Sequence, residues 1–119
     1  MIRIGIIGYG YWGPRIARNF YALKDCEVAA ICDKSPELLQ RAAAAFPGVT
    51  TTSVASDVIC SPEIDAVAVI TPVWTHFELA KAALENGKHV FVEKPFTSTS
   101  EQAEELIELA ARKRLQIMV

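Results

Sequence analysis

Three features that set a sequence apart from ordinary globular proteins are missing here: a long apolar run, an excess of basic charge and a paired-cysteine motif. No apolar run is longer than residues 66–70, which is far shorter than the roughly 20 residues that cross a membrane as a helix. Lys and Arg number 12 against 14 Asp and Glu, so no surplus of cations is available to neutralise nucleic-acid phosphates. We therefore expect neither a membrane nor a nucleic acid as partner.

Cysteine is scarce, and its three positions, Cys26, Cys32 and Cys60, are widely spaced. None forms the C-x-x-C pair that is typical of a zinc site or a redox dithiol. We expect three free thiols and no metal site. The start of the chain also lacks the charged, apolar and small-residue series of a signal peptide, which favours a cytoplasmic protein.

A chain of 119 residues has room for one domain, which at this size buries roughly two-thirds of the surface of the unfolded chain. Hydrophobic residues make up 51% of the sequence and charged residues 22%, the composition of a globular domain. No repeat, low-complexity segment or flexible linker interrupts it. We interpret residues 1–119 as a single domain.

Short apolar runs alternate with segments of helical periodicity along the whole chain. Strands are predicted at 2–7, 28–32, 50–52, 66–70, 89–92 and 115–119, and helices at 12–24, 36–46, 55–60, 76–86 and from 99 onward. Near-continuous apolar strands separated by helices are typical of a parallel sheet covered on both faces. The predicted fold class is α/β, a doubly wound parallel sheet in one three-layer αβα domain.

Local signals indicate the helix ends and the buried helix faces. Ser35 before Pro36 predicts an N-cap, Gly87 a C-cap, and Thr99 with Gln102 a capping box. Helical spacing predicts two buried stripes, on the first helix Ile16, Phe20 and Leu23, and on the last helix Ala103, Leu106, Ile107, Ala110 and Ala111. Because the chain ends inside an apolar strand, we expect it to be the N-terminal domain of a longer protein.

The strongest chemical signal is the run Gly8-Tyr-Gly-Tyr-Trp-Gly13, which has the pattern G-x-G-x-x-G. It follows a predicted strand and opens a predicted helix, the context of a dinucleotide-binding turn in a Rossmann fold. Gly8 would make the tight turn, Gly10 would let the backbone approach a pyrophosphate, and Gly13 would let the helix pack closely. With Tyr11 and Trp12 between them, these residues would bind the phosphates at the helix N-terminus. The alternative is a glycine turn that only satisfies the strand-to-helix geometry.

An acidic residue is expected about 20 positions further on, where it accepts hydrogen bonds from the adenosine ribose. Asp33 lies there, at the end of the second predicted strand. Its carboxylate would repel a 2′-phosphate and so favours NAD over NADP, whereas the neighbouring cation Lys34 could partly accept that phosphate. The alternative for Asp33 is a solvated turn residue.

Two further polar clusters follow the fourth and fifth predicted strands, at the sheet edge where ligands of open α/β sheets bind. The first runs from Thr71 and Pro72 to His76, and the second is Glu93-Lys94-Pro95. We expect Thr71, Pro72, His76, Glu93 and Lys94 to touch the nicotinamide half of the cofactor, with Lys94 placed to act on a substrate hydroxyl. The alternatives are a solvated, ion-paired Lys94 and a His76 that makes only structural hydrogen bonds.

In this order the motifs resemble the N-terminal domain of the glucose-fructose oxidoreductase, inositol dehydrogenase and rhizopine-catabolism (Gfo/Idh/MocA) family. The resemblance covers essentially the whole chain, and Glu93-Lys94-Pro95 is far more specific than the glycine motif. It implies an NAD(P)-dependent oxidoreductase acting on a CH-OH group of a sugar, cyclitol or sugar nucleotide. The segments 10–14 and 18–20 further resemble members that oxidise the 3-hydroxyl of UDP-linked aminosugars or their uronates.

The same resemblance implies roles for individual residues. The glycine turn would bind the pyrophosphate and Asp33 the adenosine ribose, while Thr71 and Pro72 would line the nicotinamide side. Glu93 and Lys94 would contact the nicotinamide ribose and the substrate, with Lys94 as the catalytic candidate. The family also has a C-terminal domain that carries most of the substrate pocket and the homo-oligomer interface; it is absent from these residues, so the chain alone is expected to bind a dinucleotide without turnover.

Two other function classes stay open. One is a non-catalytic module that senses a dinucleotide and regulates a partner, which the Glu93-Lys94-Pro95 turn disfavours because sensing needs no lysine at the hydride site. The other is a different Rossmann protein, such as a nucleotide-binding subunit or a methyltransferase, in which Gly10 and Asp33 would serve an adenosyl group.

Overall fold

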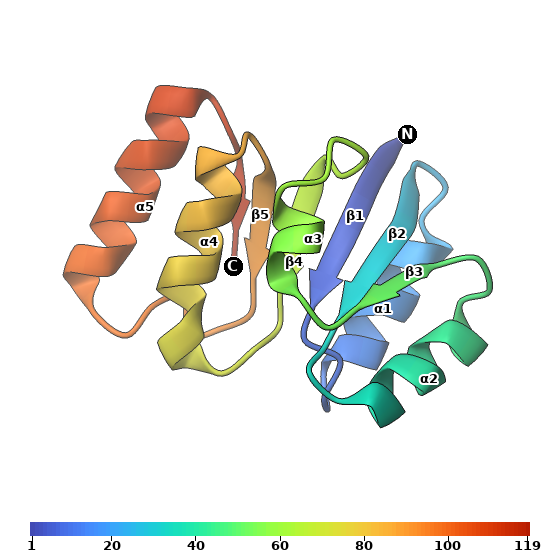
Figure 1. The fold of residues 1–119 in the computed structure, drawn as a ribbon. Coiled ribbons are helices and arrows are strands. Elements are labelled where there is room, and N and C mark those ends of the chain that lie inside the picture. The colour runs from blue at the N-terminus through green and yellow to red at the C-terminus, as the bar shows by residue number, and fades with distance from the viewer.

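The computed structural model describes all 119 residues, and strands alternate with helices along the chain (Figure 1). The strands are β1 Ile2–Ile7, β2 Cys26–Cys32, β3 Thr50–Thr52, β4 Ala66–Val69, β5 His89–Val92 and β6 Ile117–Met118, and the helices are α1 Gly13–Ala22, α2 Pro36–Ala45, α3 Ala55–Ile59, α4 His76–Glu85 and α5 Ser100–Lys113. A 3₁₀ turn, η1, covers Val73–Thr75. None of these helices is both long and apolar enough to cross a bilayer.

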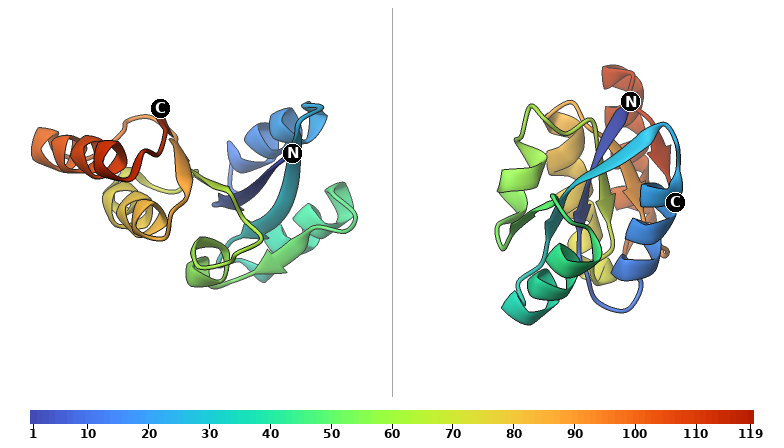
Figure 2. Two further views of the ribbon diagram at one scale, coloured as in Figure 1. Left: turned by 90° about the horizontal axis from the view of Figure 1, so that it is seen from above. Right: turned by 90° about the vertical axis from the view of Figure 1, so that its right-hand side faces the viewer.

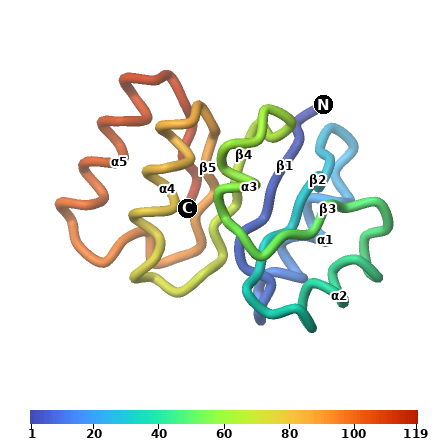
Figure 3. Tube along the Cα trace, in the orientation of Figure 1, coloured from blue at the N-terminus to red at the C-terminus, as the bar shows by residue number.

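The six strands form one parallel sheet in the order β3-β2-β1-β4-β5-β6. After β3 the chain runs through α3 and returns to the middle of the sheet, where β4 pairs with β1 (Figure 3). The direction of winding therefore reverses between β1 and β4. In a Rossmann fold this reversal opens a crevice at the carboxyl ends of the strands, which is the ligand-binding edge.

Helices cover both faces of the sheet, so the predicted three-layer αβα fold is confirmed. Side chains of α3, α4 and α5 pack on one face, and those of α1 and α2 pack on the other. Figure 2 (right) shows α1 in blue and α3 in light green on opposite sides of the sheet. The central strands β1 and β4 are buried along most of their length because they lie between these layers.

The local helix signals act largely as predicted. The Ser35 hydroxyl accepts a hydrogen bond from the Leu38 N–H at 3.3 Å, and the Thr99 hydroxyl accepts one from the Gln102 N–H at 3.2 Å. The capping box is only half formed, since the Gln102 side chain accepts from the Ser98 N–H instead of returning to Thr99. The C-cap of α4 is Asn86, and Gly87 follows it with a φ of 77°.

Two predicted buried stripes are partly wrong. α1 ends at Ala22, so Leu23 lies past the helix and is 52% exposed, while Ala17 takes the buried place on the sheet. On α5 the buried face is Leu106, Leu109 and Ala110, and Ile107 is 56% exposed. On α5, helical spacing allows either of two sets of apolar side chains to face the core, and only contact with α4 and β5 decides which set is buried. The final strand is also shorter than predicted, because only Ile117 and Met118 pair with β5.

A buried lysine ties the loop before β4 to the loop after α4. The Lys88 ammonium is buried and donates to the backbone carbonyls of Ser61 and Ile64. We expect Lys88→Met to lower the free energy of unfolding by about 2 kcal/mol, because two carbonyls would lose their donor. Urea unfolding followed by circular dichroism measures this loss.

The matched control is Lys81→Met, which removes an exposed ion pair with Glu105. Surface pairs of this kind contribute little to stability, so the control variant should unfold at nearly the same urea concentration as the unaltered chain. Equal midpoints for the Lys88 and Lys81 variants would show that the buried ammonium stabilises nothing.

Candidate functional site

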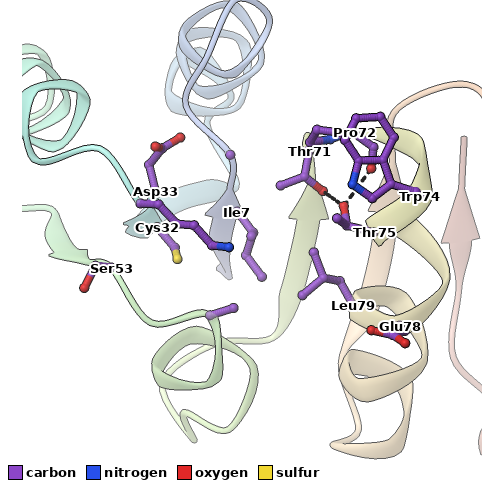
Figure 4. Close-up of a pocket in the computed structure, with 13 residues that line it drawn as sticks. Ile7, Cys32, Asp33, Ser53, Thr71, Pro72, Trp74, Thr75, Glu78 and Leu79 are labelled. Carbon is purple, nitrogen blue, oxygen red and sulfur yellow. Dashed lines mark hydrogen bonds between the residues drawn. The ribbon is translucent and has the colours of Figure 1, made fainter.

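A cavity of about 540 Å³ opens at the carboxyl edge of the sheet, at the reversal between β1 and β4 (Figure 4). One side, the β2 bank, is made by Cys32, Asp33, Lys34, Ser53 and Ala55. The other side, the β4 bank, is made by Thr71, Pro72, Trp74, Thr75, Glu78 and Leu79. Ile7 and Gly8 lie between the banks, so the cavity is where the fold predicts a ligand.

The three motif glycines have different surroundings. Gly8 has a φ of 103°, and a side chain there would collide with the carbonyl of Ile70 on the loop after β4. A side chain at Gly13 would collide with the carbonyl of Gly8. The fold itself therefore requires glycine at these two positions, as the sequence pattern predicts.

Gly10 is different, because no atom lies within 4 Å of the place a side chain would take. Nothing in the folded chain excludes a larger residue here. Gly48 and Gly87 are equally open, but both have a positive φ that favours glycine, whereas Gly10 does not. Neither packing nor backbone conformation requires glycine at position 10, which leaves the approach of a ligand to the backbone as the reason for it. The residues at this turn thus fit a bound pyrophosphate.

The N-terminus of α1 follows Gly10 directly and has free donors. Its N-cap, Trp12, makes no side-chain hydrogen bond to the first turn, and the N–H groups of Tyr11, Trp12 and Gly13 donate to no protein acceptor. The Arg15 guanidinium lies over the rings of Tyr11 and Trp12, 5.0 and 5.4 Å from their centroids. Free N–H groups, the helix dipole and a nearby cation together favour an anion at this end of α1.

Asp33 joins the two turns that border the β2 bank. One carboxylate oxygen accepts from the Tyr9 N–H at 2.7 Å, and the other accepts from the Ser35 N–H at 2.9 Å. Asp33 is thus neither free nor merely solvated: it fixes the glycine turn against the β2–α2 turn. Each oxygen keeps a second lone pair for a ligand hydroxyl. Sequence reasoning missed the Tyr9 contact, which joins residues 24 positions apart and has no sequence signal.

The remaining β2-bank residues give the cavity little reactivity of its own. Burial raises the pKa of the Cys32 thiol to about 11, so it stays protonated at neutral pH. Lys34 is exposed beside Asp33, where its cation can reach a ligand at the rim. All three cysteines are free thiols, as predicted.

The β4 bank is a stiff turn. The Thr71 and Thr75 hydroxyls are 2.6 Å apart, and the Thr75 hydroxyl also donates to the Pro72 carbonyl at 2.6 Å. Figure 4 shows Thr71, Pro72 and Trp74 on the side of the cavity opposite Cys32 and Asp33. The Trp74 residue is 75% exposed, and sequence reasoning did not single it out. An exposed tryptophan beside a cavity is the signal that could have marked it.

The second polar cluster lies one strand further along the edge. The Glu93 N–H donates to the Val69 carbonyl at 3.0 Å, which continues the sheet pairing past β5. Lys94 is exposed and forms no ion pair with Glu93 or any other acid. The peptide between Lys94 and Pro95 is cis. Both side chains follow β5 at the same sheet edge as the cavity but outside its lining.

The chain matches the model of the oxidoreductase family with an NAD-binding Rossmann fold, Gfo/Idh/MocA, over residues 2–119. The chain belongs to this family. The predicted resemblance is confirmed, and the chain is an NAD(P)-binding Rossmann domain of a Gfo/Idh/MocA oxidoreductase.

Individual relatives and solved structures show how similar the chain is to other members and how much of their length it covers. The chain is 44% identical over 109 residues to the uncharacterized oxidoreductase YdgJ of Escherichia coli, covering 92% of this chain and 31% of that protein. It is 34% identical over 123 residues to UDP-N-acetylglucosamine 3-dehydrogenase of Acidithiobacillus ferrooxidans, covering 99% and 36%. Biliverdin reductase of Synechocystis, solved with biliverdin and NADP⁺, superposes with a TM-score of 0.94 at 32% identity, covering 99% and 37%. This Gfo/Idh/MocA chain thus spans about a third of the length of these relatives.

Proposed function

We propose that the chain is the cofactor-binding part of a dehydrogenase that moves a hydride between a nicotinamide and a CH-OH group of a sugar, cyclitol or sugar nucleotide. The observation that carries the proposal is the glycine turn, which leaves open space at Gly10 and free N–H groups at the start of α1, and whose Tyr9 N–H donates to Asp33. A ligand with an anionic centre and neighbouring hydroxyls can use these N–H groups and the Asp33 carboxylate together. The bound nicotinamide would supply the hydride acceptor.

The residues divide the cofactor among them. The N–H groups from Tyr11 to Gly13 bind the pyrophosphate, and the free lone pairs of Asp33 accept from the adenosine ribose. Thr71 and Pro72 on the β4 bank line the nicotinamide side. Glu93 holds the nicotinamide ribose, and Lys94, whose ammonium has no acidic partner, lies at the substrate hydroxyl.

The substrate class rests on two similarities. Segments 10–14 and 18–20 resemble members acting on UDP-linked aminosugars, and one relative is named UDP-N-acetylglucosamine 3-dehydrogenase. We propose a sugar or sugar nucleotide of this kind as substrate, a homo-oligomeric full-length protein, and turnover only in the full-length protein. The free thiols agree with the reducing conditions of the cytoplasm, where we place the protein.

Cofactor preference follows from the charge beside the adenosine ribose. We expect the chain to bind NADH more tightly than NADPH, because the Asp33 carboxylate repels a 2′-phosphate. Asp33→Asn removes the charge but keeps an acceptor for one of the two N–H groups. It should reduce the ratio of NADH affinity to NADPH affinity by about tenfold. Fluorescence titration of both reduced cofactors measures the ratio.

Lys34→Ala is the companion variant, since it removes the cation that tolerates a 2′-phosphate and should widen the preference. Tighter binding of NADPH than NADH by the unaltered chain would contradict the assignment of Asp33. Biliverdin reductase of Synechocystis, at 32% identity, was solved with NADP⁺, so a preference for NADPH is the outcome to test against.

The alternative is a module that binds the dinucleotide and never turns it over. It differs from the proposal in one measurement, the oxidation of UDP-N-acetylglucosamine or inositol by the full-length protein with NAD⁺. An increase in the absorbance of reduced nicotinamide supports the dehydrogenase. Binding of the dinucleotide without turnover of any sugar or sugar nucleotide in a panel favours the non-catalytic module.

A further inference from the structure

His76 is the most deeply buried polar side chain of the fold, and it lies between the two loops that carry the proposed nicotinamide site. Only 1% of the residue is exposed. Its Nε2 is 2.6 Å from the Thr71 carbonyl, in the loop after β4. Its Nδ1 is 2.9 Å from the Pro95 carbonyl and 3.3 Å from the Phe96 carbonyl, in the loop after β5. One ring thus spans two loops.

Both ring nitrogens face backbone carbonyls. A carbonyl only accepts, so a neutral imidazole donates to one loop while its other nitrogen only touches the second loop, and a ring with hydrogens on both nitrogens donates to both loops. In either state no nitrogen is left to bind a ligand in the cavity, and the buried ring does not reach solvent. Direct contact of His76 with the cofactor, expected from sequence, is therefore not what this geometry offers.

The two loops have few other ties to each other. The loop after β5 joins the sheet through the Glu93 N–H and the Val69 carbonyl, one residue before Lys94. Phe96 also packs against the core, but beyond that packing and the Glu93 bond, the hydrogen-bonding contacts between the two loops run through the side chain of His76. The β4 turn, by contrast, is braced internally by the Thr71 and Thr75 hydroxyls.

We propose that His76 is a positioning residue that sets the distance between the β4 bank and the Glu93-Lys94 loop, and so shapes the nicotinamide half of the site. This inference rests on the proposed function. The adenosine half should not depend on it, because the clamp made by Asp33 uses the N–H groups of Tyr9 and Ser35 and no atom of His76.

The test compares a whole cofactor with a fragment of it. NADH and ADP are titrated calorimetrically into the unaltered chain and into His76→Ala. ADP carries the adenosine and the pyrophosphate but neither nicotinamide nor its ribose. We expect His76→Ala to weaken the binding of NADH by on the order of tenfold, which is the effect of losing one or two buried hydrogen bonds. The affinity for ADP should change by less than about twofold.

Two further variants separate positioning from general stability. His76→Gln keeps an amide donor and should recover part of the NADH affinity. His89→Ala is the matched control, since His89 also joins two segments, accepting from the Gln116 N–H at 3.0 Å, but at the opposite end of β5. It should leave both affinities unchanged.

Each outcome has one meaning. Equal loss of NADH and ADP, or no loss of either, overturns the positioning role, and if His76→Ala does not fold, the same comparison is judged on His76→Gln. Failure of the unaltered chain to bind NADH overturns the proposed function instead, so the two failures can be told apart.

Discussion

Gly10→Val should abolish dinucleotide binding and leave the chain folded. The Cβ position at Gly10 has no neighbouring atom within 4 Å, so we expect valine to cost little stability. It would instead fill the space in which the pyrophosphate approaches the N–H groups of Tyr11, Trp12 and Gly13. Losing two charge-assisted hydrogen bonds weakens binding by at least about 10²-fold. Calorimetric titration with NADH and thermal unfolding measure the two effects separately.

The other two glycines of the motif provide the contrast. Gly8→Ala and Gly13→Ala place a methyl group against backbone carbonyls, of Ile70 and of Gly8, which cannot move cheaply. These variants should lose stability, whereas Gly10→Val should lose binding alone. Unchanged NADH affinity in a folded Gly10→Val chain would show that the ligand does not lie on this turn.

The sequence predicts the parts of this site that depend on neighbours along the chain. The glycine turn, the end of β2 at Asp33 and the two proline-stopped loops each follow from local spacing, and the parallel sheet follows from the alternation of strands and helices. Parallel strands bring their carboxyl ends to one edge, so the residue pattern alone is enough to assign the residues at those ends to one edge of the sheet.

Contacts between residues far apart in the sequence could not be predicted in the same way. The bond from Tyr9 to Asp33 and the ring of His76 between Thr71 and Pro95 depend on the distance between loops, which no local pattern encodes. The prediction that Ile107 is buried was wrong for a related reason: helical spacing allows several apolar faces of α5, and packing against α4 selects the one that is buried. A role that depends on contact with a ligand, above all the role proposed for Lys94, is likewise not encoded by local spacing and is decided by experiment.

Lys94→Ala in the full-length protein should lower kcat by on the order of 10² to 10³ and change NAD affinity little. Hydride leaves a carbon as the hydroxyl on that carbon loses its proton, so negative charge develops on oxygen in the transition state. An ammonium at that oxygen stabilises the transition state more than the ground state, and therefore acts on kcat. Lys94 follows β5 at the cofactor edge, and no acid neutralises its charge.

Glu93→Ala separates binding from chemistry at the same loop. Glu93 is proposed to hold the nicotinamide ribose, so its removal should raise KM for NAD with a smaller change in kcat, the opposite division to Lys94→Ala. Lys24→Ala, an exposed lysine after α1, is the control for loss of one surface charge and should change neither constant. If Lys94→Ala kept a near-normal kcat, the ammonium would not stabilise the developing charge. The lysine would then be a solvated residue at the end of a strand, and the hydroxyl proton would have to leave to another group.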